Sequence, residues 1–143
     1  MANDCIPFKR PGDDVTGKAE AAITGCRCVQ ISGDMTSNPV LGLPNTADGG
    51  LYTVGHPNVS GAAGAGKMIF GVAKYDALIN GRVGVIRGGI VPIEAGAAIA
   101  PGAEVEVDAT GRVITLASGV AIGTCLTTCT GAGVQAVVAL HIE

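Results

Sequence analysis

The chain of 143 residues contains few aromatic side chains and no tryptophan. Its four aromatic residues are Phe8, Tyr52, Phe70 and Tyr75. A surface that stacks nucleic-acid bases or sugar rings needs several aromatic faces, so this chain has little material for one. The net charge of −3 argues in the same direction, because binding to phosphate backbones depends on clustered Lys and Arg. Direct binding of nucleic acid is therefore not expected.

Charged residues are also scarce, at 15% of the chain against a usual value of about 25%. No apolar run reaches the ~18 residues that a membrane span needs, so no membrane partner is expected. The first 14 residues lack the apolar core of a signal peptide, which predicts a protein made and kept in the cytoplasm of the host cell. Five cysteines form an odd set in such a chain, and free thiols are the simpler interpretation.

The abundant residues are small or β-branched. Sixteen Val and twelve Ile outnumber seven Leu, and β-branched side chains favour strands over helices. The 23 Gly and 7 Pro supply many turns between short strands. The length suits one domain with a single core. We therefore predict an all-β fold, namely a small β-barrel or a sandwich-like barrel.

The beginning of the chain differs from the rest. Residues 1–18 are polar, contain two prolines and lack periodicity, which predicts an extended N-terminal arm that becomes ordered on another molecule. Residues 19–143 are expected to form a single β-barrel-like domain. Within it, residues 33–66 are rich in Gly and Pro and are expected to be a loop segment that contains only short strands.

Alternating apolar residues and turn signals divide the chain into candidate strands. The predicted strands cover residues 19–23, 26–32, 51–54, 68–75, 81–87, 89–94, 103–108, 112–117, 121–126 and 134–142. The best helix candidate, residues 94–102, is short and is ended by Pro101. A faint internal repeat relates residues 70–85 to residues 122–137. It is either chance similarity or two related hairpins that close one barrel.

The segment from Gly61 to Lys67 fits the first part of a phosphate-binding loop, G-x-x-x-x-G-K. Met68 then stands where such a loop places Ser or Thr to hold magnesium. A phosphate-binding loop must also open a helix, whereas the residues that follow predict a strand. A flexible Gly/Ala loop is the favoured interpretation.

Cysteine and histidine allow three further interpretations. The first is a zinc site, with ligands from the pairs Cys26/Cys28 and Cys125/Cys129 and from His56 and His141. The spacing within each cysteine pair fits a zinc site poorly. An intramolecular disulfide formed after release from the cell is a second possibility. Inert thiols that act as small apolar side chains are favoured over both.

We find no set of residues for catalysis. The chain has no G-x-S-x-G motif, and both histidines are predicted to be structural or solvated. Glu104, Glu106 and Asp108 alternate along one predicted strand and could bind a cation or act as acid and base, but an exposed strand face protected by charge is more common. We therefore predict a protein that is not an enzyme, with no catalytic residue, no cofactor and no metal ligand.

Two long stretches, PGDDVTGKAEAAITGCRCVQISGD and the run from Phe70 to Gly123, carry a family resemblance. The most telling parts are residues 11–17, 71–76 and 100–105, in that order along the chain. Over residues 7–140 the sequence resembles the capsid decoration, or cement, proteins of tailed bacteriophages.

The resemblance implies a virion structural protein that binds the outer surface of an assembled phage capsid and stabilises it by bridging major capsid subunits. It also implies that the major capsid protein is the partner, that the chain forms a homo-oligomer, namely a trimer, and that it is located on the capsid exterior. The apolar and cationic cluster in the arm is suited to this docking. The expected capsid contacts are Ile6, Pro7, Phe8, Lys9, Arg10 and Pro11.

Two alternatives belong to other functional classes. An exposed virion adhesion module would use the loops at 33–66 to bind a glycan on the host surface. A nucleotide-binding or hydrolytic enzyme would use Gly61 to Lys67, and this is the weaker of the two.

Overall fold

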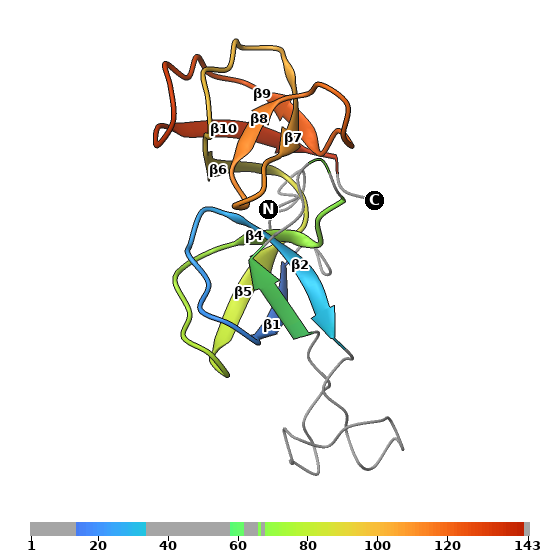
Figure 1. Cartoon of the computed structure of the whole chain (residues 1–143), viewed down its shortest axis with the longest axis vertical. Coiled ribbons are helices and arrows are strands. Elements are labelled where there is room, and N and C mark those ends of the chain that lie inside the picture. The colour runs from blue at the N-terminus through green and yellow to red at the C-terminus, as the bar shows by residue number, and fades with distance from the viewer. Residues whose placement is uncertain (1–13, 34–57, 62–65, 67, 142–143) are drawn as a thin grey trace, which may run out of the picture.

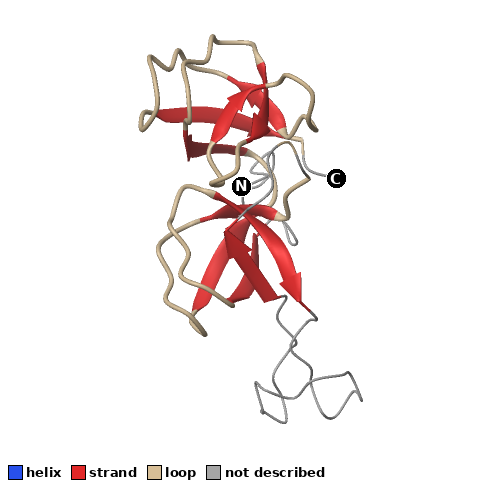
Figure 2. Cartoon of the chain, viewed as in Figure 1, coloured by secondary structure: helices blue, strands red, loops and turns tan. Residues whose placement is uncertain are grey.

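The computed structural model describes residues 14–33, 58–61, 66 and 68–141. In this part of the chain there are ten strands and no helix, so the predicted all-β fold is confirmed. Figure 2 shows how loops connect the strands. The strands are β1 (Asp14–Ala19), β2 (Cys28–Gly33), β3 (Asn58–Gly61), β4 (Gly71–Ala73), β5 (Arg82–Ile86), β6 (Ile90–Glu94), β7 (Glu104–Val107), β8 (Val113–Thr115), β9 (Gly123–Cys125) and β10 (Gln135–Leu140).

Strands β1 to β5 form a closed barrel in the order β1-β3-β2-β4-β5, which we call the N-terminal barrel. One edge of β1 lies antiparallel to β5, from Asp14 opposite Ile86 to the last pair at Lys18. The other edge of β1 pairs in parallel with β3, where Ala19 lies opposite Val59. Because β1 pairs with both neighbours, the sheet has no free edge there.

Strands β6 to β10 form a second five-stranded sheet in the order β6-β10-β9-β7-β8, which we call the C-terminal sheet. Its two edge strands approach each other where β6 ends, and a single parallel bridge joins Ala95 to Val113. This bridge in the C-terminal sheet is the counterpart of the parallel pairing of β1 with β3 in the N-terminal barrel. The two units lie one beyond the other along the long axis of the molecule (Figure 1).

The two units repeat one pattern of strand pairing. Val29 of β2 lies opposite Gly71 of β4 in the barrel, and Val105 of β7 lies opposite Gly123 of β9 in the C-terminal sheet. Each antiparallel strand pair of the barrel has a counterpart in the C-terminal sheet: β1–β5 corresponds to β6–β10, β2–β3 to β7–β8, β2–β4 to β7–β9, and β4–β5 to β9–β10. The chain therefore contains two copies of one five-stranded unit.

The buried residues follow the same duplication. Eight of them fill the N-terminal barrel, and each has a counterpart in the core of the C-terminal sheet. The pairs are Ala19 and Ala95, Ile23 and Ile99, Val29 and Val105, Val59 and Val113, Ala73 and Cys125, Ala77 and Cys129, Val83 and Ala136, and Val85 and Val138. The second core also takes in Cys28, Ile69 and Val72 from the N-terminal half, so the two units are packed together.

Glycine is required at one position of each copy. A Cβ atom on Gly71 would lie 2.5 Å from the carbonyl oxygen of Ile86, and one on Gly123 would lie 2.3 Å from that of Ala139. Both contacts are with backbone in the neighbouring strand, which cannot move without breaking the strand pairing. The repeated glycine therefore lets two strands approach closely around a core of small side chains.

Left-handed backbone conformation also recurs at equivalent turns. Cys26 has φ of 57° where the second copy has Gly102 at 84°, and Asn80 has φ of 66° where the second copy has Gly133 at 85°. Glycine adopts this region without the steric cost that other residues incur. The second copy thus has the better residue at both turns.

Most sequence-based predictions of strands agree with the structure. All seven strands predicted after residue 67 are present, and residues 94–102 contain no helix. Residues 19–23 were predicted as a strand, but beyond Ala19 they form a loop with one bridge at Ile23. The predicted strand at 51–54 lies outside the described residues.

Two expectations about organisation need correction. Residues 14–18 were placed in the extended arm, but they form β1 of the barrel, because Val15 to Lys18 pair with β5. The faint repeat, left open above between chance similarity and two hairpins that close one barrel, is a real duplication, but β4–β5 belongs to one unit and β9–β10 to the other, and each unit has its own core. The remaining domain boundaries, including an arm before residue 14, stay a prediction.

The duplicated close approach predicts how the chain responds to an added methyl group. Gly71→Ala and Gly123→Ala should each lower the free energy of unfolding by about 3 kcal/mol, because the new Cβ atom meets backbone. Gly131→Ala is the control, since a Cβ atom there has no neighbour within 4 Å, and it should change stability by less than about 0.5 kcal/mol. Urea unfolding measures all three, and equal effects would contradict the role of the close approach.

Candidate functional site

Backbone hydrogen bonds fasten the two units to each other. The amide of Glu94 donates to the carbonyl of Cys26 at 2.8 Å, and the amide of Cys28 donates to the carbonyl of Gly111 at 2.8 Å. Gly66 donates to Val107 at 2.7 Å and accepts from Val120 at 2.8 Å. These bonds connect segments far apart in the sequence, so the junction has a defined geometry rather than being a hinge.

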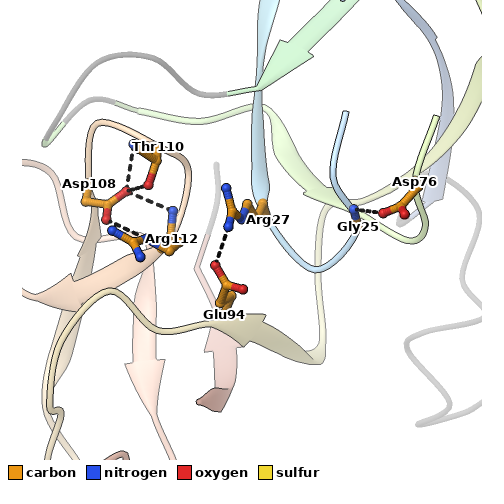
Figure 3. Close-up of polar contacts among 7 residues, drawn as sticks. All are labelled: Gly25, Arg27, Asp76, Glu94, Asp108, Thr110 and Arg112. Atoms are coloured by element: carbon orange, nitrogen blue, oxygen red, sulfur yellow. Dashed lines mark hydrogen bonds and ion pairs between the residues drawn. The ribbon is translucent and has the colours of Figure 1, made fainter. Parts of the chain in front are cut away.

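An ion pair and a buried thiol add to this junction. The guanidinium of Arg27 lies 2.6 Å from the carboxylate of Glu94, and Figure 3 shows the pair bridging the two units. Both side chains are about 30% exposed, which limits the stabilisation by this pair. Burial, assisted by the charge of Asp108, raises the pKa of the Cys28 thiol to about 12. Cys28 is therefore a neutral packing residue at neutral pH.

The turn that contacts Cys28 is built around Asp108. Its carboxylate accepts hydrogen bonds from the amide and hydroxyl of Thr110 and from the amide and Nε of Arg112, at 2.8–3.1 Å (Figure 3). Burial acts to raise the pKa of Asp108, but these donors outweigh it and the pKa is lowered. Gly111 completes the turn with φ of 86°. Asp108 is therefore a structural residue, whose charged carboxylate stabilises the turn at residues 108–112.

Glu106 has a similar structural role. It is only 6% exposed, and its carboxylate accepts hydrogen bonds from the amides of Ala117 and Gly119, both at 2.8 Å. The backbone donors of Ala117 and Gly119 lower the pKa of Glu106 despite its burial. The expected exposed face of Glu104, Glu106 and Asp108 is therefore wrong for the last two, because a loop covers one and a turn encloses the other.

The motifs considered for catalysis or metal binding do not assemble into a site. Among the described residues, no group of three or more His, Cys, Asp or Glu side chains could hold a metal ion. The four described cysteines are free thiols. The residues after Lys67 lead into strand β4 without a helix, as predicted. His56 lies outside the described residues, and His141 is exposed just after β10.

The N-terminal barrel presents two loops, residues 20–26 and 74–81, as one surface that we call the paired-loop face. Ile23 and Ala77 exchange two backbone hydrogen bonds at 2.8 and 2.9 Å across it. The amide of Gly25 donates to the carboxylate of Asp76 at 2.8 Å (Figure 3). These contacts fix the backbone of both loops against each other.

Large apolar side chains lie exposed on this fixed surface. Leu78 is 80% exposed, Ile79 62% and Tyr75 52%. The turn that carries them is held by the amide of Asn80, which donates to Ala19 at 2.7 Å, and by a bond from Gly81 to Leu78 at 2.9 Å. An exposed apolar tip on a rigid turn is typical of an interaction surface, because little entropy is lost when it docks.

The C-terminal sheet has the equivalent pair of loops, residues 96–102 and 126–133. Ile99 and Cys129 join them as Ile23 and Ala77 do in the barrel. These loops contain no charged residue. At the position that corresponds to the Leu78–Ile79 tip they carry the small residues Thr130, Gly131 and Ala132. The fold therefore does not require large apolar side chains at this turn.

The sequence-predicted contacts Ile6, Pro7, Phe8, Lys9, Arg10 and Pro11 all lie outside the described residues. The apolar tip at residues 75–79 was not predicted as a site. The predicted strands end at residue 75 and begin again at residue 81, which places Leu78 and Ile79 in a connection, but the pattern does not tell whether apolar residues there are buried or exposed.

Comparison with known proteins decides the family. The model of the phage cement protein family matches residues 9–140. The chain belongs to the phage cement protein family. The predicted family resemblance is thereby confirmed, and the chain is a virion structural, capsid-associated protein. Comparison with curated proteins finds no match.

A solved structure shares the fold of this cement protein. The head fiber gp8.5 N base in bacteriophage phi29, a crystal structure, aligns with a TM-score of 0.66 and 14% sequence identity. The alignment covers 90% of this chain and 92% of the phi29 chain. At this identity the likeness establishes the fold. None of the described residues forms a helix that could span a membrane.

The buried carboxylate of Glu106 predicts acid sensitivity. Because its pKa is lowered from 4.5 on folding, its ionised form stabilises the native state above about pH 4.5, and this contribution is lost as the pH falls through the lowered pKa. Glu106→Gln should make stability fall less steeply below pH 4.5. Urea midpoints across this range measure it, with Glu104→Gln on the exposed part of β7 as control. Identical slopes for wild type and Glu106→Gln would contradict the prediction.

Proposed function

We propose that this protein binds the outer surface of the assembled phage capsid and stabilises the shell by bridging neighbouring major capsid subunits. Membership of the cement family supports capsid association. The observation that carries the finer proposal is the rigid, exposed Leu78–Ile79 tip of the N-terminal barrel. In this proposal the protein acts mechanically, through the hydrogen-bonded junction between its two units and the exposed apolar side chains of the Leu78–Ile79 turn.

The comparison of the two copies supports this assignment. Both copies build the same paired loops and the same core, yet only the first carries Leu and Ile at the turn. Exposed large apolar side chains oppose solubility, so their presence at a turn that folds equally well with Thr and Gly favours a binding role. A pocket in the coat protein that takes both side chains would bury most of their exposed area.

The N-terminal arm supplies a second contact in this proposal. Ile6, Phe8, Lys9 and Arg10 combine apolar and cationic groups just before β1, the strand that leads into the barrel. An arm and a rigid tip on one chain give two linked contacts, and linked contacts bind far more tightly than either alone. Bridging then follows when the two contacts engage different capsid subunits.

We also propose that the protein acts as a homotrimer. The N-terminal barrel has a core of only eight buried residues and the C-terminal sheet contributes only twelve, which leaves part of the stabilisation to contacts between subunits. Three copies would in addition multiply the weak contacts of arm and tip on the shell.

The capsid contact predicts the behaviour of two variants. Leu78→Thr combined with Ile79→Ala, which copies the turn of the C-terminal sheet, should reduce occupancy on capsids at least ~10-fold, because the apolar contact is lost. Deletion of residues 2–12 should abolish co-sedimentation while leaving a folded body. Quantitative co-sedimentation with capsids that lack the protein measures both.

The matched control is Ile90→Thr, which removes an exposed apolar side chain, 64% exposed, from β6 rather than from the paired-loop face. It should bind capsids as the wild type does. Thermal unfolding of each variant checks that the fold is intact. Unchanged occupancy of the tip variant and of the truncation would overturn the proposal.

The trimer is tested in solution. Size-exclusion chromatography with light scattering should give three times the chain mass of 14.1 kDa. The mass should stay the same for Leu78→Thr with Ile79→Ala, since the tip is assigned to the capsid and not to the trimer. A monomeric mass at micromolar concentration would contradict the trimer, and dissociation of the tip variant alone would reassign the tip to the subunit interface.

A further inference from the structure

The outward surface of the C-terminal sheet is free of charge across three neighbouring strands. Alternate residues of β6, β10 and β9 are buried in the core, so the residues between them face outward. The strand register sets six of these outward residues, which we call the outer sheet patch, in two rows across the strands, Pro92–Val137–Leu126 and Ile90–Ala139–Thr124. The rows lie side by side, so the patch is continuous.

Most of this patch is apolar, and much of it is exposed. Ile90 is 64% exposed and Leu126 is 46% exposed. Pro92 is exposed as well, and the other three residues of the patch are half-buried. A continuous apolar surface of this kind is typical of a contact with another molecule, because a soluble chain gains nothing from leaving it in water.

The equivalent surface of the N-terminal barrel carries charges instead. Asp14 begins β1 as Ile90 begins β6, and Lys74 directly follows β4 as Leu126 directly follows β9. The amides of Lys74 and Leu126 donate to the neighbouring strand in the same way, at 2.9 and 2.7 Å. In the barrel, the amino group of Lys74 lies 2.9 Å from the carboxylate of Asp14, with side chains 43% and 41% exposed. The fold therefore does not require apolar residues at these positions.

The charge pattern around the patch fits a second copy of the chain. Copies related by a symmetry axis bring equivalent residues together near the axis, where a charged residue would meet its own kind and be repelled. The carboxylates lie at the rim of the patch rather than inside it. Glu94 follows Pro92 on β6 and is paired with Arg27 at 2.6 Å, and Glu104 lies opposite Thr124. An apolar centre with a polar rim is the usual arrangement of a protein interface.

Pro92 directs such a contact to the face of the sheet rather than to its edge. β6 is an edge strand of the C-terminal sheet and pairs along its length with β10 alone. Proline has no amide hydrogen, so the open edge of β6 lacks a donor in the middle of the strand. Addition of a strand from another chain is thereby disfavoured, whereas the outer sheet patch stays accessible.

We propose that the outer sheet patch is the surface through which copies of this chain associate, with the three patches facing one another around the axis of the homotrimer. This inference rests on the homotrimer proposed above and names the face that forms it. The Leu78–Ile79 tip belongs to the other unit, which the hydrogen-bonded junction holds in a fixed position. Self-association and capsid contact therefore use different surfaces.

A double variant tests the patch in solution. Ile90→Asp combined with Leu126→Lys installs the charged pair that the barrel carries at the equivalent positions. Size-exclusion chromatography with light scattering at micromolar concentration should give three chain masses for the wild type and one for the variant, because burying charged groups in an apolar contact is costly. Far-ultraviolet circular dichroism checks that the strands are intact. The control Ile90→Thr keeps the patch uncharged and retains Leu126 and Pro92, so it should stay trimeric.

Photo-crosslinking gives a second readout that does not depend on the folding of the double variant. Benzoylphenylalanine in place of Leu126 should join two chains covalently when the free protein is irradiated. The same probe in place of Leu78 should not, because the tip is assigned to the capsid. Both side chains are exposed on the single chain, so the probe has room at either position.

The possible outcomes separate this inference from the proposed function. A trimeric double variant, or a lack of crosslinks from position 126, would overturn the patch as the interface and leave the homotrimer standing. A monomeric wild type would overturn both, without affecting the capsid contact of the tip. A double variant that stays trimeric but no longer co-sediments with capsids would assign the patch to the coat protein instead.

Discussion

Each five-stranded unit encloses only a small core, of eight buried residues in the N-terminal barrel and twelve from the C-terminal sheet, and this limit governs the rest of the molecule. Val, Ala, Ile and Cys fill it, and the strands come so close that glycine is needed at Gly71 and Gly123, where a Cβ atom would meet the backbone of the next strand. A core this small contributes little stability by itself. The molecule therefore packs two such units together through shared hydrogen bonds and a shared core that includes Cys28.

Because the fold is built twice, differences between the copies separate what the fold needs from what it does not. The connection from β2 to β3 spans residues 34–57, whereas its counterpart between β7 and β8 is the turn at 108–112. The turn at Leu78 and Ile79 is apolar and its counterpart is not. Two buried alanines are matched by Cys125 and Cys129. Each of these additions is tolerated by a unit that folds without it, which favours a functional origin.

The strands of the second half could be predicted from the sequence because glycine turns separate short alternating runs of Val and Ile. β1 could not, since a polar strand that contains Gly17 becomes apparent only when it pairs with β5. β3 could not be predicted either, because it has only four residues and lies between stretches rich in Gly and Pro. The duplication was visible only in part, because the distance between equivalents changes along the chain. Val29 and Val105 are 76 positions apart, but Gly71 and Gly123 are 52 apart, owing to the longer connection after β2.

The candidate site was harder to predict than the fold. Alternation correctly placed Glu106 opposite the inward-facing Val105 and Val107, but it could not show that backbone amides of a later loop cover the carboxylate. Likewise, Leu78 and Ile79 carry no signal in the sequence that distinguishes an exposed tip from a core. Membership of the cement family supports the proposed capsid contact of the Leu78–Ile79 tip, and neither the composition nor the fold alone indicates such a contact.

A density map of the intact virion at side-chain resolution tests the central claim most directly. The account predicts this chain on the outside of the shell, with Leu78 and Ile79 of the N-terminal barrel seated against the major capsid protein and the C-terminal sheet held away from it by the fixed junction. A shell that lacks the chain, or a bound chain whose paired-loop face points into solvent, would contradict it.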